Sequence, residues 1–130
     1  MPTPDCYDYA VIRVVPRVER EEFVNVGVIL SCPARDFLDA RLHVEHARLV
    51  SFAPDLDLAL VEQHLAVIPL VCRGGEAAGA IGALTARQRF HWLVAPRSAI
   101  IQMSPVHSGV TDDPAATLQQ LLQTMVLPRG

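Results

Sequence analysis

The sequence predicts a single α+β domain over residues 1–130, with a mainly antiparallel sheet of about five strands and helices packed on one face. Two observations support this prediction. Segments with the period of two that strands show come first in a group of three and later in a group of two, and helical spacing follows each group. Strands that occur in runs argue for an antiparallel sheet covered by helices, in the element order β-β-β-α-β-β-α.

The composition is that of a compact globular protein. Hydrophobic residues make up 51 % of the chain and charged residues 19 %, far from the composition of disordered proteins. The net charge of −3 and the pI of about 5.9 give no general electrostatic case for nucleic acid or an anionic membrane. All eleven basic residues are arginines, whose planar guanidinium suits bidentate contacts with carboxylate or phosphate.

The cysteines and the apolar segments indicate a soluble cytoplasmic protein. Cys6, Cys32 and Cys72 are odd in number and have no CxxC spacing, so we expect reduced thiols rather than a disulfide framework or a zinc knuckle. Residues 1–9 lack the basic and apolar regions of a secretory signal. The most apolar window, residues 58–71, is interrupted by polar residues and is too short to span a bilayer, so no membrane contact is expected.

The first two strands are predicted to form a hairpin. Residues 7–15 are β-branched and aromatic and read as an inner strand, and residues 17–22 form a charged connector. Residues 23–31 then alternate, so that one face of the strand carries four apolar residues: Val24, Val26, Val28 and Leu30. A connector of this length predicts an antiparallel hairpin with a loop longer than the tight two-residue kind.

A third strand and the first long helix follow. Residues 37–44 alternate apolar and polar residues, as a half-buried strand does. Helical spacing then predicts a helix from about Asp57 to Ile68, and Pro69 is expected to end or kink it because proline lacks an amide donor. Residues 73–82 carry four of the seven glycines and are expected to form a flexible loop, with room for one helical turn and without a phosphate-binding motif.

The second half is predicted to add two strands and a helix. Residues 89–94 alternate with apolar Phe90, Trp92 and Val94, and residues 99–103 form a short fifth strand. Residues 104–111 are expected to be a loop. The aspartates before Pro114 then cap a final helix that has proline at its first position, where the missing amide costs nothing.

Strand alternation also predicts one polar sheet face: Arg13, Asn25, Gly27, Asp39, Arg41, His43, Arg89 and His91. Such a face can bind a carboxylate, a phosphate or a single nucleic-acid strand. The alternative is a wet face kept for solubility. Aromatic residues, at 5 %, leave few platforms for stacked bases.

No catalytic, metal-binding or cofactor-binding motif is predicted. His43 and His46 lie three residues apart, but the first falls on a strand and no third ligand is close in sequence. The glutamates of the charged connector are expected to be solvated, because catalytic carboxylates need burial or a partner to tune them. The serines lack a GxSxG or SxxK spacing.

Several of these residues form motifs. Tyr9, Arg13 and Pro16 make a Y-x-x-x-R-x-x-P strand, and Arg20-x-Glu22 is followed by the run NVGV, which begins at Asn25. With Arg89-Phe90, the PRS run at residues 96–98 and Ser104-Pro105, the chain resembles the bacterial domain-of-unknown-function family 3037 over nearly its whole length. Carried over to this sequence, the polar motif positions are Arg13, Arg20, Glu22, Asn25, Arg97 and Ser104.

The resemblance implies no activity. Genes of that family often lie beside those for proteins similar to the toxin kinase HipA, so the resemblance implies a partner protein encoded in the same operon.

Three functions stay open at this point. The first is a binding or adaptor module that recognises a partner protein. The second is an enzyme or ligand-binding domain for an anionic small molecule, with Arg13, Arg20 and Arg97 as a clamp, Glu22 as base and Asn25 as orienting group; with Arg41 and Ser104 these are the predicted ligand-binding residues. The third is nucleic-acid binding, which the acidic pI disfavours. The apolar excess also allows a homodimer.

Overall fold

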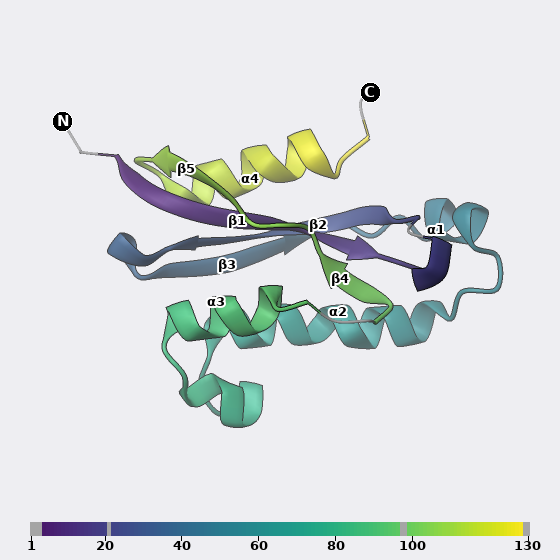
Figure 1. Cartoon of the computed structure of the whole chain (residues 1–130), viewed down its shortest axis with the longest axis horizontal. Coiled ribbons are helices and arrows are strands. Elements are labelled where there is room, and N and C mark those ends of the chain that lie inside the picture. The colour runs from purple at the N-terminus through teal and green to yellow at the C-terminus, as the bar shows by residue number, and fades with distance from the viewer. Residues whose placement is uncertain (1–3, 21, 97–98, 129–130) are drawn as a thin grey trace.

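The computed structural model describes residues 4–20, 22–96 and 99–128. Within these ranges, five strands form one antiparallel sheet in the order β3-β2-β1-β4, and β5 also pairs with β1 (Figure 1). Their bounds are β1 Asp5–Val14, β2 Val24–Cys32, β3 Phe37–Leu42, β4 Ile101–Met103 and β5 His107–Thr111. The predicted α+β class, the antiparallel sheet of five strands and the single domain are confirmed.

In the described part of the chain, four α-helices and three short 3-10 segments connect and cover these strands. The α-helices are α1 His46–Phe52, α2 Leu58–Arg73, α3 Ala86–Val94 and α4 Pro114–Met125; the 3-10 segments are η1 Val18–Arg20, η2 Pro33–Arg35 and η3 Glu76–Ala83. Asp57 and Asp113 cap α2 and α4 by accepting hydrogen bonds from Leu60 N and Ala116 N, both at 3.2 Å. The predicted starts of these two helices are therefore confirmed.

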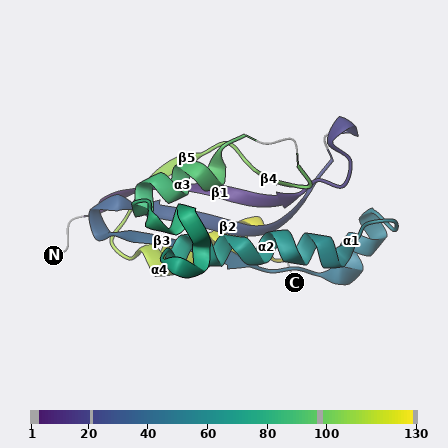
Figure 2. The same ribbon diagram turned by 90° about the horizontal axis from the view of Figure 1, so that it is seen from below.

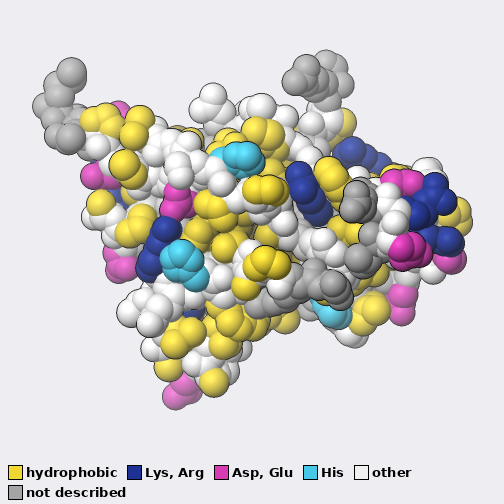
Figure 3. Space-filling model, in the orientation of Figure 1, with side chains coloured by type: hydrophobic (Ala, Val, Ile, Leu, Met, Phe, Trp, Pro, Cys, Tyr) yellow, Lys and Arg dark blue, Asp and Glu magenta, His cyan; other side chains and the backbone are white. Residues whose placement is uncertain are grey.

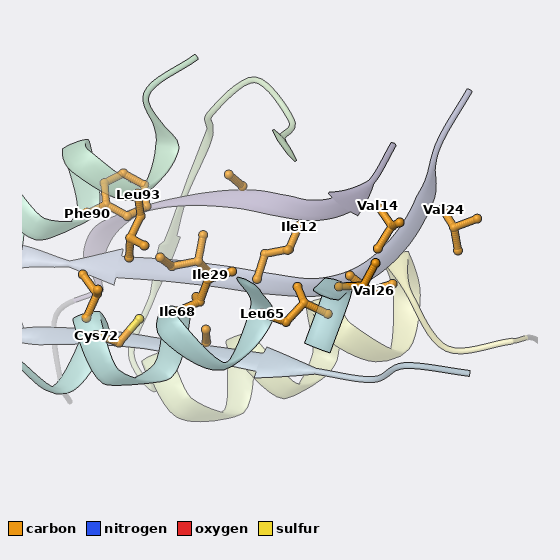
Figure 4. Packing of buried hydrophobic residues seen from close by; sticks show 14 of the residues in the cluster. Ile12, Val14, Val24, Val26, Ile29, Leu65, Ile68, Cys72, Phe90 and Leu93 are labelled. Carbon is orange, nitrogen blue, oxygen red and sulfur yellow. The ribbon is translucent and has the colours of Figure 1, made fainter. Parts of the chain in front are cut away.

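Helices cover both faces of the sheet, so the prediction of helices on one face was wrong. Figures 1 and 2 show α2 and α3 on one face and α4 on the other. In Figure 4 Leu65, Ile68 and Cys72 of α2 point toward sheet residues, among them Ile12 and Ile29. The second core lies under α4: Val28, Leu30, Cys32, Leu118, Leu122 and Val126. Two helical layers are needed because β2 is apolar on both of its faces.

A β-bulge in β2 explains which residues face which helix. The register pairs Ile12 with Gly27 but Arg13 with Asn25, so Val26 is the extra residue. An extra residue reverses the alternation beyond it, because successive side chains point to opposite faces. Even-numbered residues before and at the bulge therefore face the α2–α3 core, whereas even-numbered residues after it face α4. The predicted common face was wrong: Val24 and Val26 face α2 and α3, whereas Val28 and Leu30 face α4.

Two segments of the second half have a different secondary structure from the one predicted. Residues 89–94 belong to helix α3, because Thr85 and Gln88 form a capping box that starts a helix there. Three alternating apolar residues were too few to distinguish the period of a strand from that of a helix, because Phe90 and Leu93 also share one helical face. The predicted loop at residues 104–111 contains β5, which pairs with β1 from Asp5 to Tyr9.

Helix α2 does not end at Pro69 as predicted. It continues to Arg73, where Gly74 closes it. The burial of Val71 and Cys72 against the sheet in the last turn offsets the one amide donor that the proline lacks. Among the described residues no single helix has the length and apolarity to cross a membrane; α2 and η3 reach them only together, across a bend of 63°.

Candidate functional site

An open groove lies between α2, the end of α3 and β4. Its volume is about 540 Å³, and its wall is mostly apolar, with Val67, Ile68, Trp92, Leu93, Ile101 and Met103. Three other lining residues can form hydrogen bonds: Gln63, His64 and Gln102. Figure 3 shows hydrophobic side chains gathered on this side of the molecule, between the β4–β5 edge and the helices below it. The groove therefore offers an apolar floor with a few polar groups on its walls.

Sequence reasoning missed this groove. Reading residues 89–94 as a strand placed Trp92 in the sheet core, whereas α3 turns it toward the groove. One signal was present in α2, where Val67 in the groove wall is 45 % exposed and Leu60, seven residues earlier on the same helical face but outside the groove lining, is 41 % exposed. Apolar residues exposed on the outer face of an amphipathic helix indicate a binding surface, because a helix face turned to water is normally polar.

Arg20 and Glu22 form an ion pair at the other end of the molecule. Arg20 Nε lies 2.7 Å from Glu22 Oε1, and Arg17 pairs with Asp55 at 3.3 Å. All four residues line a polar cavity of about 260 Å³ beside α1. Figure 3 shows side chains of both charges gathered at the right-hand end, where α1 lies in Figure 1. Each of the two predicted residues already has an oppositely charged partner there.

Arg13 and Asn25 are direct neighbours across β1 and β2. Asn25 Nδ2 donates to the Met125 carbonyl of α4 at 3.1 Å, and the Arg13 guanidinium lies 3.9 Å above the Phe23 ring centroid. Arg13 Nε and Asn25 Oδ1 are buried without a hydrogen-bond partner. Asn25 lines a separate cavity of only about 10 Å³, so it shares no described cavity with Arg20 and Glu22.

The remaining predicted residues lie apart from both groups. Arg41 pairs with Asp39 on the edge strand β3. Ser104 is buried between β4 and β5, where its Oγ accepts from Val11 N at 2.8 Å and donates to the Pro105 carbonyl at 2.9 Å. The hydroxyl thus gives the Val11 amide of β1 a hydrogen-bond partner at a position that neither β4 nor β5 pairs with. Arg97 lies outside the described residues.

The predicted polar sheet face is incomplete. Arg89 and His91 lie on α3 rather than on the sheet. Gly27 belongs to the opposite, apolar face, where a Cβ would stand 2.7 Å from Leu42 Cδ2 and 3.1 Å from Ile12 Cδ1. Arg13 and Asn25 are on the α4 face, as the bond to Met125 shows. The structure therefore replaces the single polar face with separate local groups.

A polar network that the sequence did not reveal joins α3 to three strands. Asp8 accepts from Arg87 Nη2 at 2.6 Å and from the Ser108 hydroxyl, and Arg87 Nη1 donates to Ser31 Oγ at 3.1 Å. The hydrogen bond from Ser108 lowers the pKa of the Asp8 carboxyl, Arg87 lowers it further, and partial burial opposes both. No spacing links Asp8 with Arg87, which is 79 residues away.

The three cysteines differ in exposure: Cys6 is exposed, whereas Cys32 and Cys72 are buried. Burial raises the pKa of Cys72 to about 12, so its thiol stays protonated at neutral pH and is a poor nucleophile. Cys6 and Cys32 are also free thiols. Within the part of the chain that the structure describes, no three His, Cys, Asp or Glu side chains are grouped so that they could hold a metal ion.

A family model described as "Protein of unknown function (DUF3037)" matches residues 9–126. Comparison with curated proteins and with solved structures gave no match.

Proposed function

This chain belongs to the DUF3037 family, and we propose that it is a binding module that takes an apolar segment of a partner protein into the groove between α2, α3 and β4. The observation that carries the proposal is the groove itself. A volume of about 540 Å³ is within the range of binding pockets, and its apolar wall with a few polar groups is their usual composition.

The lining residues suit a peptide segment. Trp92 offers a large aromatic surface, the residue type that most often anchors protein–protein contacts. The side chains of Gln63 and His64 can donate to and accept from the backbone of a bound segment. These groups orient a segment whose apolar side chains fill the floor.

The neighbouring sheet edge supports the same proposal. β4 stands at the end of the strand order, and Val106, which follows it in the chain, is 43 % exposed. An exposed edge strand pairs readily with an extended segment of another chain. The family resemblance makes a HipA-like kinase a first partner to test, and the three free cysteines are in keeping with the cytoplasmic location that we propose.

Two matched variants test this proposal. Val67→Arg puts a charge in the groove, whereas Leu60→Arg puts one on the same helix outside the groove lining. Apolar peptides selected by display on the wild-type protein are titrated, and the fluorescence of Trp92, the one tryptophan of the chain, reports occupancy. We expect Val67→Arg to weaken binding about tenfold or more and Leu60→Arg to leave it unchanged. Equal effects of the two variants, or selected peptides that leave the fluorescence unchanged, would contradict the proposal.

The occupant can also be a second copy of this chain. Light scattering of the wild-type protein then gives the mass of a dimer, and Val67→Arg gives that of a monomer. This outcome would show that the groove mediates homodimerisation, and it would contradict the proposal that the groove binds another protein.

A further inference from the structure

Side chains seal one of the two outer edges of the sheet. His43 N donates to Val26 O of β2 at 2.7 Å, so the backbone groups of Ala40, three residues earlier, point away from β2. Asp39 Oδ1 accepts from Ala40 N at 2.8 Å, and Arg41 Nη1 donates to Ala40 O at 3.3 Å. Another strand would find these outward groups of β3 already bonded, and proteins protect sheet edges by blocking them in this way.

The other edge is formed by β4 and β5, and backbone hydrogen bonds show which residues of β1 face it. Ser104 N donates to Val11 O at 2.8 Å, on the side of β1 where β4 lies. Val15 N donates to Ile100 O at 2.7 Å on the same side. Successive residues of a strand direct their backbone groups to opposite sides. The odd-numbered residues of β1 therefore bond toward β4 and β5.

The outer edge of β5 is open. Tyr7 of β1 is opposed to Gly109, so Gly109 directs its N–H and C=O to β1. Those of its neighbours, Ser108 and Val110, therefore point outward. In the described part of the chain, neither a further strand nor a side chain bonds to these outward groups. Figure 2 shows β5 at the rim of the sheet, with β1 on its inner side. Unlike β3, this strand has free donors and acceptors along its edge.

The side chains along this edge carry no charge. Residues 104–111 include no Asp, Glu, Lys or Arg. Val110 is 67 % exposed, the highest value among the large hydrophobic residues that the structure describes, and Val106, just before the strand, is 43 % exposed. Edge strands that face water usually carry charged residues. An uncharged edge with two exposed valines is therefore typical of a strand that another strand covers.

We infer that β5 pairs antiparallel with β5 of a second copy of this chain, about a two-fold axis at Ser108. In this register Ser108 is opposed to Ser108 of the second copy, and Val110 is opposed to Val106 of the second copy. The exposed valines are thereby covered in pairs on both sides of the axis. The two five-stranded sheets join into one continuous sheet.

The symmetry of the edge favours a second copy over a segment of another protein. A two-fold contact needs a surface that complements itself, and Val106 and Val110 lie two residues to either side of Ser108. Two copies that each carry a net charge of −3 meet most readily where the surface is uncharged, as it is along this edge. None of residues 106–111 lines the groove between α2, α3 and β4, so the inference does not depend on the proposed function.

Light scattering over a dilution series of the full chain tests for this dimer. Val110→Pro removes an amide that points away from β1, and edge strands tolerate proline at such positions. We expect the wild-type protein to dimerise, and Val110→Pro and Val110→Lys each to weaken dimerisation about tenfold or more. Val50→Lys, at a 44 % exposed valine of α1, and Val67→Arg in the groove should leave the dimer intact. A wild-type protein that stays monomeric at every concentration, or a dimer that Val50→Lys or Val67→Arg weakens equally, would overturn the inference.

Disulfide crosslinking tests the register. Cys6 is the exposed thiol, so the variants also carry Cys6→Ser. Residues that exchange hydrogen bonds across an antiparallel pair have Cα atoms about 5.5 Å apart, within the reach of a disulfide, so oxidation should link Ser108→Cys into a covalent dimer. Val110→Cys is the control, because its two copies would lie four residues apart along the strands, about 14 Å, and should stay unlinked in non-reducing electrophoresis. No linkage of Ser108→Cys, or equal linkage of the two variants, would refute the two-fold axis at Ser108.

Discussion

Gly74 closes α2 in a backbone conformation that glycine alone adopts readily. Its φ of 75° and ψ of −168° lie in the left-handed half of the map, and Gly75 repeats them with 80° and −169°. The two glycines differ in their surroundings. A Cβ on Gly74 would stand 2.4 Å from Arg89 Nη1, whereas one on Gly75 would meet no atom within 4 Å. A comparison of the two positions therefore separates the cost of backbone strain from the cost of steric contact.

We expect both Gly74→Ala and Gly75→Ala to lower the free energy of unfolding, each by about 1–3 kcal/mol from backbone strain. Gly74→Ala should cost more, because Arg89 is 9 % exposed and has little room to move. Denaturant unfolding of both variants measures the difference. In an Arg89→Ala background the two costs should become equal; a difference that persists there would show that Arg89 does not cause it.

At the scale of elements, the contact between Asp8 and Arg87 fixes α3 against the sheet. The carboxylate accepts from α3 and from β5, and Arg87 reaches on to β2. Figure 1 shows that α3 lies beside the sheet. The network of Asp8 and Arg87 and the burial of Phe90 and Leu93 hold it there. Helix α3 is therefore tied to three strands, β1, β2 and β5.

The lowered pKa of Asp8 predicts a dependence of stability on pH. A carboxyl whose pKa is lower in the folded state stabilises the protein above its unfolded pKa, and this contribution is lost as the pH falls through about 4 and below. We expect the melting temperature of the wild-type protein to fall more steeply between about pH 5 and pH 3 than that of Asp8→Asn. Asp8→Asn should also be less stable at pH 7.

An exposed carboxylate gives the control for this experiment. Asp55 pairs with Arg17, and both side chains are largely exposed, so Asp55→Asn should leave the slope close to that of the wild-type protein. Parallel curves for wild type and Asp8→Asn would show that the Asp8 network does not couple folding to protons.

At the scale of the whole molecule, β2 joins two hydrophobic cores. One of its faces packs on α2 and α3 and the other on α4. A strand shared in this way makes the two layers depend on each other, because neither keeps its apolar surface buried if β2 leaves the sheet. The protein should therefore unfold in one cooperative step.

Two core variants test this coupling. Leu65 in α2 and Leu118 in α4 are buried on opposite faces, so Leu65→Ala and Leu118→Ala should each cost about 2–5 kcal/mol. Trp92 lies on the α2–α3 side. We expect Leu118→Ala to shift the denaturation midpoint seen by Trp92 fluorescence as much as that seen by circular dichroism, with Gln119→Ala in the exposed part of α4 as control. A fluorescence midpoint that Leu118→Ala leaves unchanged would show that the α4 layer unfolds separately.

The sequence by itself determined the local features of this protein. The period of two marked the first three strands, the aspartates at Asp57 and before Pro114 marked two helix starts, and the grouping of elements marked the α+β class. The motifs that begin at Tyr9 and Asn25 also indicated the family that the comparison confirms. These features depend on neighbours within a turn or a strand, where side-chain spacing and capping act directly.

Tertiary structure alone decided which of these residues meet. One extra residue at Val26 turned part of β2 to the other face, α4 took the face that was expected to stay wet, and α3 turned Trp92 to the groove. Arg13 met Asn25, and Asp8 met Arg87, through pairings that no local pattern records. The physical reason is that strand order and packed faces depend on burial summed over distant segments, and a single inserted residue reverses which side chains are buried.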